Sequence, residues 1–245
     1  MTDIRASEYA TANRLADFLR QCTEHPAELS DLEGAGPVGE FERAFANWVG
    51  VEHAVGVSSG TAGLMTALWA AGIRPDDRVL VSSYGWPQTV AAVCAVGALP
   101  VFADIDPVSL NMSPDSAAEH VRDCRAILVT HTFGLPADMV ALSEIADAAN
   151  IPLIADAAQA LGATIDGNPV ARWADISVFS FTRHKLLNAG EGGTVVTDDR
   201  NLFERVVMTS QHSARGFRQV DCVDRRRLLG DFGLSFRMHP VAALI

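Results

Sequence analysis

Lysine is almost absent from this sequence. Of its 19 Lys and Arg residues one is a lysine, Lys185, and the remainder are arginines. Either residue can keep a protein soluble, but a guanidinium stays protonated and cannot act as an amine nucleophile. A codon bias towards arginine would explain the shortage without any function. The alternative is that the chemistry of the protein requires an amine at position 185.

Basic charge is also scarce, because 30 Asp and Glu residues give a formal net charge of −11 at pH 7. Nucleic-acid binding requires a basic surface that displaces counterions, so the charge argues against such a partner. The run 225–227 of three arginines is the local exception. We interpret it as a solvated face. The alternative is that it binds a phosphorylated small molecule or another subunit.

Cysteines are few and widely spaced: Cys22, Cys94, Cys124 and Cys222. No CxxC pair is present, so we predict neither a metal site nor a disulfide framework, and expect reduced thiols in the cytoplasm. The richest apolar stretch, residues 90–103, is interrupted by Gly97 and Pro100, and the N-terminal segment is polar. Neither a membrane span nor a signal peptide is predicted.

Short β-branched runs alternate with alanine-rich helical patterns along the whole chain. This alternation is typical of βαβ units, so we predict an α/β fold with a mainly parallel sheet flanked by helices. The predicted helices span residues 6–20, 40–50, 61–71, 87–96 and 138–149. The predicted strands number seven and span residues 53–58, 78–82, 99–105, 126–131, 151–156, 175–181 and 193–197.

The last residues, 237–245, begin a helix with Pro240 near its first turn and stop on apolar residues without a cap. We therefore expect a shortened version of a longer architecture, or a second chain that completes it. The expected organisation is an N-terminal helical segment (1–50), an α/β core (51–215) and the start of a connection to a small domain (216–245).

Two glycine-containing segments could hold anions. Gly34, Gly36 and Gly39 match GxGxxG, but a polar segment precedes them and a proline lies inside, so we interpret them as a turn into a helix. The segment VSSGTAG (57–63) instead joins a strand to a helix N-terminus, where free amides and hydroxyls can bind an anion. Simple helix capping by its Ser and Thr residues is the alternative.

Two further side chains follow predicted strands. Asp156 ends a hydrophobic strand, where it would need a cationic partner such as a protonated ring nitrogen, and Gln159 follows three positions later. A helix N-cap is the alternative role for Asp156. Trp86 could lie flat on a planar ring, or belong to the core or an interface.

Together these features match the separate needs of pyridoxal phosphate (PLP). Lys185 lies between two strands beside Gly190, Gly192 and Gly193, where backbone can approach a ligand. A lysine amine forms the Schiff base with the cofactor aldehyde, a carboxylate keeps the ring an electron sink, and a helix end binds the phosphate. Arginine could not form that bond, which explains the retained lysine.

The order of the motifs resembles the DegT/StrS family of fold type I aminotransferases. The resemblance runs from GPVGEFERAFANWVGVEHAVGVSSGTAGL through GALPVFADID and DAAQALGA to FSFTRHKLLNAGEGGTVVT. It implies that Lys185 holds PLP and carries the proton during transfer, and that Asp156 pairs with the pyridine nitrogen. It also implies that Trp86 stacks on the ring and that Gln159 lies near the ring hydroxyl. The residues that would surround the phosphate are Gly60, Thr61, Ala62 and Ser180.

The resemblance also implies substrates and partners. Family members pass an amino group from glutamate or glutamine to a keto-sugar or cyclitol ketone, and work as dimers whose sites are completed by the neighbouring subunit. The segment LSFRM resembles the donated piece, with Ser235 where many members have asparagine and Arg237 as a possible substitute. A small C-terminal domain usually follows in the family, so we expect a homodimer, or a heteromer with a chain that supplies that domain.

Three alternatives remain open from the sequence. The same scaffold carries other PLP reactions, such as the elimination performed by aminohydroxybenzoate synthases. The deoxygenating dehydratases of the family fit less well, because they carry histidine at the position of Lys185. A shortened, non-catalytic partner that stabilises or regulates a full-length homologue is the alternative from another class.

Overall fold

A seven-stranded sheet forms the centre of the computed structural model, which describes residues 2–30, 32–221 and 233–245. Cys222 and the arginine run 225–227 lie outside the described residues. The strand order is β1-β9-β8-β5-β4-β2-β3, and β9 is antiparallel to both of its neighbours while the other pairs are parallel. The predicted α/β fold with a mainly parallel sheet is confirmed.

The strands agree with the seven that the sequence predicts, although most end one to two residues earlier. Their bounds are β1 (His53–Val57), β2 (Arg78–Ser82), β3 (Leu99–Ala103), β4 (Ala126–Thr130), β5 (Leu153–Asp156), β8 (Ile176–Ser180) and β9 (Gly193–Thr197). A separate short hairpin consists of β6 (Thr164–Ile165) and β7 (Asn168–Pro169).

The five predicted helices are present, and prolines begin several of the helices because a proline in the first turn loses no hydrogen bond. The α-helices are α1 (Thr2–Glu24), α2 (Gly36–Val49), α3 (Gly60–Ala70), α4 (Pro87–Ala95), α5 (Pro114–His120), α6 (Met139–Ala149), α7 (Arg200–Ser210), α8 (Ser213–Gln219) and α10 (Pro240–Leu244). The 3-10 turns are η1 (Pro26–Leu29), η2 (Thr132–Gly134) and η3 (Val170–Trp173).

Helices cover both faces of the sheet. On one face α3, α4 and α7 pack against alternate residues of the central strands, such as Val79 and Leu128. On the other face α2, α5 and α6 pack against the residues between them, such as Leu80 and Ile127. Because both faces are buried, the central strands are apolar throughout, as parallel sheets require.

The glycine motif before α2 is a turn into a helix, as predicted. Gly34 and Gly36 adopt left-handed φ angles of 65° and 50°. A Cβ on Gly39 would lie 2.7 Å from the carbonyl oxygen of Gly34. Glycine is therefore required by the close backbone contact, and not by a dinucleotide.

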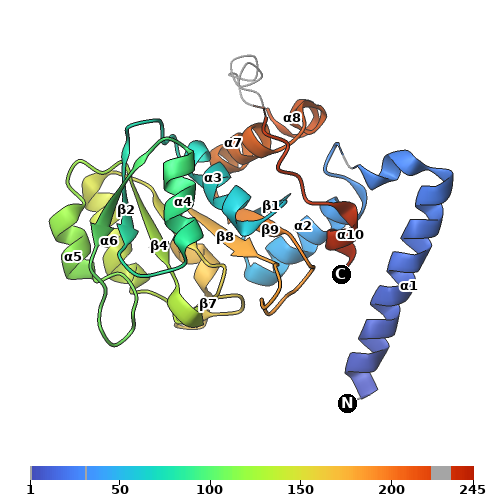
Figure 1. Ribbon diagram of the computed structural model, residues 1–245, viewed down its shortest axis with the longest axis horizontal. Helices are drawn as coiled ribbons and strands as arrows, with labels where there is room; N and C mark the ends of the chain where they lie inside the picture. The colour runs from blue at the N-terminus through green and yellow to red at the C-terminus, as the bar shows by residue number, and fades with distance from the viewer. Residues whose placement is uncertain (1, 31, 222–232) are drawn as a thin grey trace.

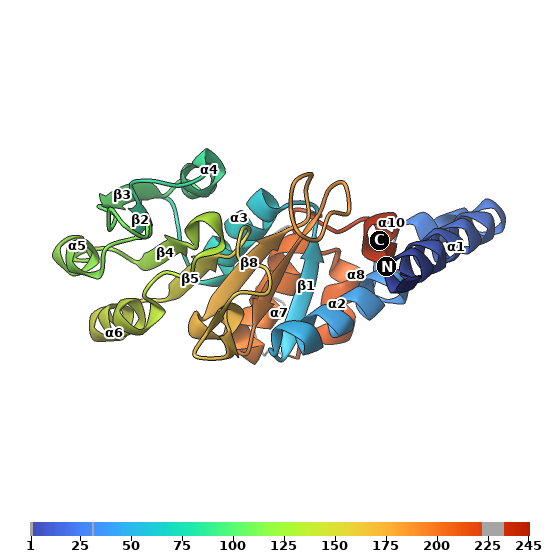
Figure 2. The ribbon, with the colours of Figure 1, turned by 90° about the horizontal axis from the view of Figure 1, so that it is seen from below.

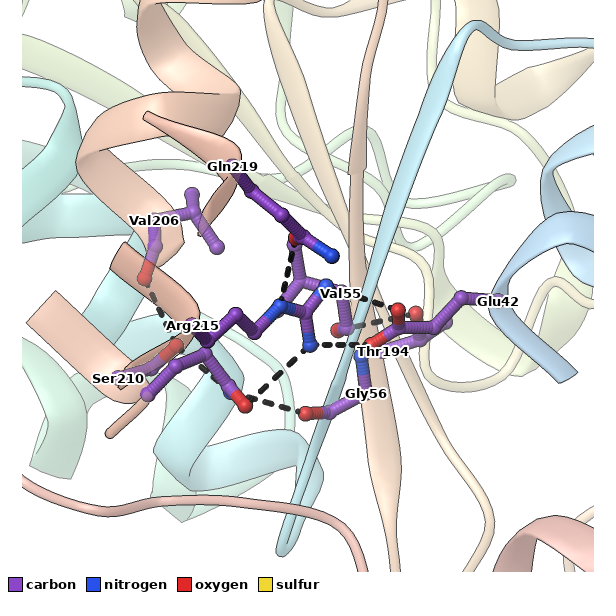
Figure 3. A network of polar contacts seen from close by, with 9 residues as sticks. Glu42, Val55, Gly56, Thr194, Val206, Ser210, Arg215 and Gln219 are labelled. Carbon is purple, nitrogen blue, oxygen red and sulfur yellow. Dashed lines mark hydrogen bonds and ion pairs between the residues drawn. The ribbon is translucent and has the colours of Figure 1, made fainter. Parts of the chain in front are cut away.

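A buried ion pair ties α2 to α8 and β1 (Figure 3). Arg215 binds both carboxylate oxygens of Glu42, and the amide of Gly56 donates to Glu42 Oε1 at 2.6 Å. Gln211 Nε2 donates to the carbonyl of Gly56 at 3.1 Å. The network thus joins α2 and α8 to the same edge strand, β1.

Helix α1 projects from one end of the molecule, and α10 lies between it and α2 (Figures 1 and 2). Phe18 and Cys22 of α1 bury their side chains with Leu244 of α10. None of the helices within the described residues is long and apolar enough to span a membrane. Cys22, Cys94 and Cys124 are free thiols, and the cytoplasmic location stays a prediction.

Candidate active site

A cavity of about 1030 Å³ opens at the carboxyl ends of the parallel strands. Parallel α/β sheets bind ligands at this edge, because the loops that leave the strands meet there. Seven of the eight predicted site residues line the cavity: Gly60, Thr61, Trp86, Asp156, Gln159, Ser180 and Lys185. Residues from five separate segments of the chain are therefore brought together, as the sequence analysis expects.

Asp156 ends β5 and is buried, with 4% of its surface exposed. Its Oδ2 accepts a hydrogen bond from Thr89 Oγ1 at 2.6 Å, and its Oδ1 accepts one from the amide of Ala158 at 3.1 Å. Burial raises the pKa of Asp156, and these two hydrogen bonds and the charge of Lys185 oppose the rise. A turn and not a helix follows the residue, so the N-cap interpretation is wrong.

Lys185 lies in the loop between β8 and β9, half-buried in the cavity wall. Its amide donates to the carbonyl of Thr182 at 3.1 Å, which closes a turn, and His184 within that turn has a φ of 76°. Burial lowers the pKa of the Lys185 ammonium, and the nearby charge of Asp156 opposes this. A lowered pKa leaves more of the amine neutral, which is the form that attacks a carbonyl.

The start of α3 meets the end of β8 at one wall of the cavity. Ser59 caps the helix by accepting the amide of Ala62 at 3.1 Å. This bond shows that the segment caps the helix, and anion binding at the same helix N-terminus stays a prediction. A Cβ on Gly60 would lie 2.8 Å from the Cβ of Ser180. Ala62 is not among the lining residues, and its amide is already used by the cap. Its contact with a phosphate stays a prediction.

Trp86 and Gln159 line other parts of the wall. Trp86 immediately precedes α4 and exposes 65% of its surface, so it is not a core residue. The side-chain oxygen of Gln159 accepts the amide of Phe133 at 3.0 Å, which holds this side chain across the loop that follows β4. An exposed aromatic ring and a fixed amide group therefore border the same cavity.

Sequence reasoning missed Thr89, whose hydroxyl binds Asp156 from 67 positions away. The available signal was its position three residues after Trp86, in the first turn of a predicted helix. Ser235 and Arg237 do not line the cavity. The backbone of Arg237 instead forms an isolated antiparallel β-bridge with Val57 of β1. The cross-subunit contact of this segment stays a prediction.

The residues present fit PLP. The cofactor requires a primary amine for its aldehyde, a carboxylate for its ring nitrogen, an aromatic surface and a helix N-terminus for its phosphate. The cavity supplies one group of each kind, and a Cβ at Gly60 would fill the wall where the helix begins. A buried carboxylate with a raised pKa is also the group that gains most from a cationic partner.

Comparison with known sequences places the chain in a family. The DegT/DnrJ/EryC1/StrS aminotransferase family matches residues 30–245, which is most of the sequence. The chain belongs to this family. Membership confirms the resemblance seen in the motif order.

Individual known proteins are similar to this chain over part of their length. Protein MosB of Rhizobium meliloti is 43% identical over 180 residues, which cover 73% of this chain and 35% of MosB. The L-glutamine:2-deoxy-scyllo-inosose aminotransferase of Streptomyces fradiae is 41% identical over 167 residues, which cover 68% of this chain and 39% of that protein. The chain therefore matches less than half of the length of these relatives.

Solved structures extend the comparison to the fold. The crystal structure of S. venezuelae DesV is 32% identical, with a TM-score of 0.81. The match covers 99% of this chain and 60% of the DesV chain. The sheet and its surrounding helices are thus shared with part of the DesV structure.

Proposed function

We propose that this chain carries the cofactor-binding part of a PLP-dependent aminotransferase. In the proposed reaction an amino group passes from glutamine or glutamate to the ketone of a cyclitol or of a keto-sugar. The observation that carries the proposal is that Lys185 and Asp156 border one cavity, with Trp86 and the start of α3 on its walls. The named activity of the Streptomyces fradiae relative supports the choice of glutamine and a cyclitol ketone.

PLP, when bound, supplies an aldehyde that captures amines and a ring that accepts electrons during amino transfer. Lys185 would hold the cofactor through its amine and later move a proton at its Nζ. Its lowered pKa favours both roles, because the neutral amine is the form that attacks a carbonyl and accepts a proton. No other lysine is present in the sequence to replace it.

Asp156 would keep the ring nitrogen protonated by pairing with it. Its carboxylate lies in a site shielded from water, where opposite charges attract each other more strongly than in solvent. Trp86 would stack on one face of the ring, and Gln159 would lie near the ring hydroxyl. Ser180 and the amides at Gly60 and Thr61 would bind the phosphate, as the N-terminus of a helix favours negative charge.

We further propose that residues 51–215 form the cofactor-binding core and that residues 216–245 lead towards a small domain. A second copy of this chain or a different chain would complete the substrate side of the cavity. Gel filtration of the loaded protein tests the partner: a dimer or a heteromer is expected. A monomer with full activity would contradict this part of the proposal.

The activity itself is tested by mixing the purified protein with PLP, L-glutamine and either 2-deoxy-scyllo-inosose or a nucleotide-linked keto-sugar. Mass spectrometry of the acceptor should show conversion of the ketone to an amine with one of the two. The Lys185→Arg variant keeps the positive charge and should give no product. Equal conversion by that variant would overturn the proposal, and so would loss of the ketone by elimination without gain of nitrogen.

A further inference from the structure

Thr89 connects the two residues proposed to contact the cofactor ring, Trp86 and Asp156. It lies in the first turn of α4, where its amide donates to the carbonyl of Trp86 at 3.0 Å. Its hydroxyl donates to Asp156 Oδ2 at 2.6 Å, which is a short distance for such a bond and typical of an ionised acceptor. Thr89 therefore contacts both the backbone of Trp86 and the carboxylate of Asp156.

The hydrogen bond between Thr89 and Asp156 is buried at both ends. Thr89 exposes 4% of its surface, and so does Asp156, so the hydrogen bond between them is largely shielded from bulk water. Among the described residues, the hydrogen bonds to the Asp156 carboxylate come from Thr89 and from the amide of Ala158, one to each oxygen. A carboxylate has about four acceptor positions, so two donors fix its plane and still leave acceptor capacity towards the cavity.

We propose that Thr89 is a positioning residue that orients the Asp156 carboxylate for the cofactor ring nitrogen. The same hydrogen bond fixes the first turn of α4 relative to Asp156. The inference rests on the proposed function, because it assumes that a pyridine ring occupies the space between Trp86 and Asp156. Pro87 supports it, since a proline at the start of α4 fixes the backbone that carries both Trp86 and Thr89.

The hydroxyl also affects the pKa of Asp156. Donation to the ionised form opposes the effect of burial on the pKa of Asp156. Among the described residues, Lys185 from the β8–β9 loop lowers the pKa of this carboxylate through its charge, and the amide of His131 donates to the carbonyl of Asp156. Arg183, His184 and Glu191 line the same cavity. Burial lowers the pKa of His131 to about 4, so its ring is neutral near pH 7.

Three variants separate positioning from plain packing. Thr89→Val keeps the shape but removes the hydroxyl, and Thr89→Ser restores it. Thr194→Val is the matched control, because Thr194 is also fully buried and its hydroxyl donates to the carbonyl of Val55 at 3.1 Å, outside the cavity lining. Titration of PLP into the cofactor-free proteins, followed by tryptophan fluorescence, measures affinity without any turnover.

Thr89→Val should weaken PLP binding about tenfold, the size expected for one hydrogen bond to a charged group, whereas Thr89→Ser and Thr194→Val should bind like the wild type. In an Asp156→Asn background Thr89→Val should cause no further loss, because the two act as a unit. Thr89→Val should also move the pH midpoint of the visible absorbance band of the loaded protein.

Two results would overturn the inference in distinguishable ways. If Thr89→Val binds PLP as Thr194→Val does, with the same pH midpoint, the assignment of Thr89 fails while the proposed function stands. If the wild-type protein itself binds no PLP, the proposed function fails and the inference fails with it.

Discussion

Arg215 donates to both carboxylate oxygens of Glu42, with Nη1 and Nη2 each 2.8 Å from their acceptors, although 173 positions separate the two residues (Figure 3). Both side chains are almost completely buried. Neither charge could remain in this interior without the other, because an unpaired buried charge is costly. The pair therefore holds α8 against α2 and β1.

Removing the cation should destabilise the protein strongly. Arg215→Met leaves the Glu42 carboxylate buried without its ion pair, which costs about 3–5 kcal/mol of unfolding free energy. Urea unfolding of the cofactor-free protein measures the loss. Arg218→Met is the control, because Arg218 pairs with Glu33 at the surface and should change stability by less than about 1 kcal/mol. Similar losses in both variants would contradict the role of the buried pair.

Adding a methyl group where α3 meets β8 should distort the part of the cavity wall at which we propose that the phosphate binds. In Gly60→Ala the new Cβ would meet the Cβ of Ser180 at 2.8 Å, so one of the two segments must shift. Such overpacking costs about 1–3 kcal/mol, and PLP affinity should fall with it. Gly85→Ala also adds a methyl to the cavity lining, but its nearest contact is an ordinary 3.6 Å. A greater loss of stability in Gly85→Ala than in Gly60→Ala would refute the close contact.

Acid should destabilise the protein partly through His131. Its pKa is lowered from 6.5 to about 4 because the ring is fully buried. As the pH falls from 6.5 towards 4, the unfolded chain binds a proton that the folded protein does not, so stability falls, by about 3 kcal/mol in total. His131→Asn cannot be protonated and should flatten the unfolding free energy across this range. An unchanged slope in that variant would assign the acid sensitivity to other groups.

Asp156→Asn should affect the thermal stability of the cofactor-free protein and of the PLP-loaded protein differently. Burial raises the pKa of Asp156, so the cofactor-free protein loses stability from this group as the pH rises above 3.8, the usual pKa of an Asp, through its raised folded value. At pH 8 the cofactor-free variant should therefore melt no lower than the wild type.

Added PLP gives the second half of this prediction, because at a given concentration a ligand that binds the folded protein more tightly stabilises it more. PLP should raise the melting temperature of Asp156→Asn much less than that of the wild type. Asp138→Asn, at the N-cap of α6, is the control and should keep the full increase. A full increase in Asp156→Asn as well would show that the carboxylate does not contact the cofactor.

Local patterns explain why much of the site could be predicted. Asp156, Gly60 and Lys185 each follow or border a strand whose residues can be recognised without tertiary information, and parallel strands deliver their ends to one edge. The sequence patterns do not predict α5, α7 or α8, although Ser113 and Asp199 are typical caps that precede the first two.

Contacts between distant segments could not be predicted. The bond from Thr89 to Asp156 depends on the packing of α4 over β5, and the ion pair of Glu42 and Arg215 depends on how α8 returns to β1. The sequence contains these residues but no local pattern that pairs them. The close approach of Gly60 to Ser180 likewise follows from the sheet order and not from either segment alone.

The central claim is that the amine of Lys185 holds PLP. It is tested most directly by loading the protein with PLP, reducing it with borohydride and mapping the modified peptide by mass spectrometry. Because Lys185 is the single lysine of the sequence, the cofactor mass should appear on the peptide that contains it, and should be absent from that peptide in Lys185→Arg. A protein that remains unmodified, or that carries the label only on its N-terminal amine, would contradict the account.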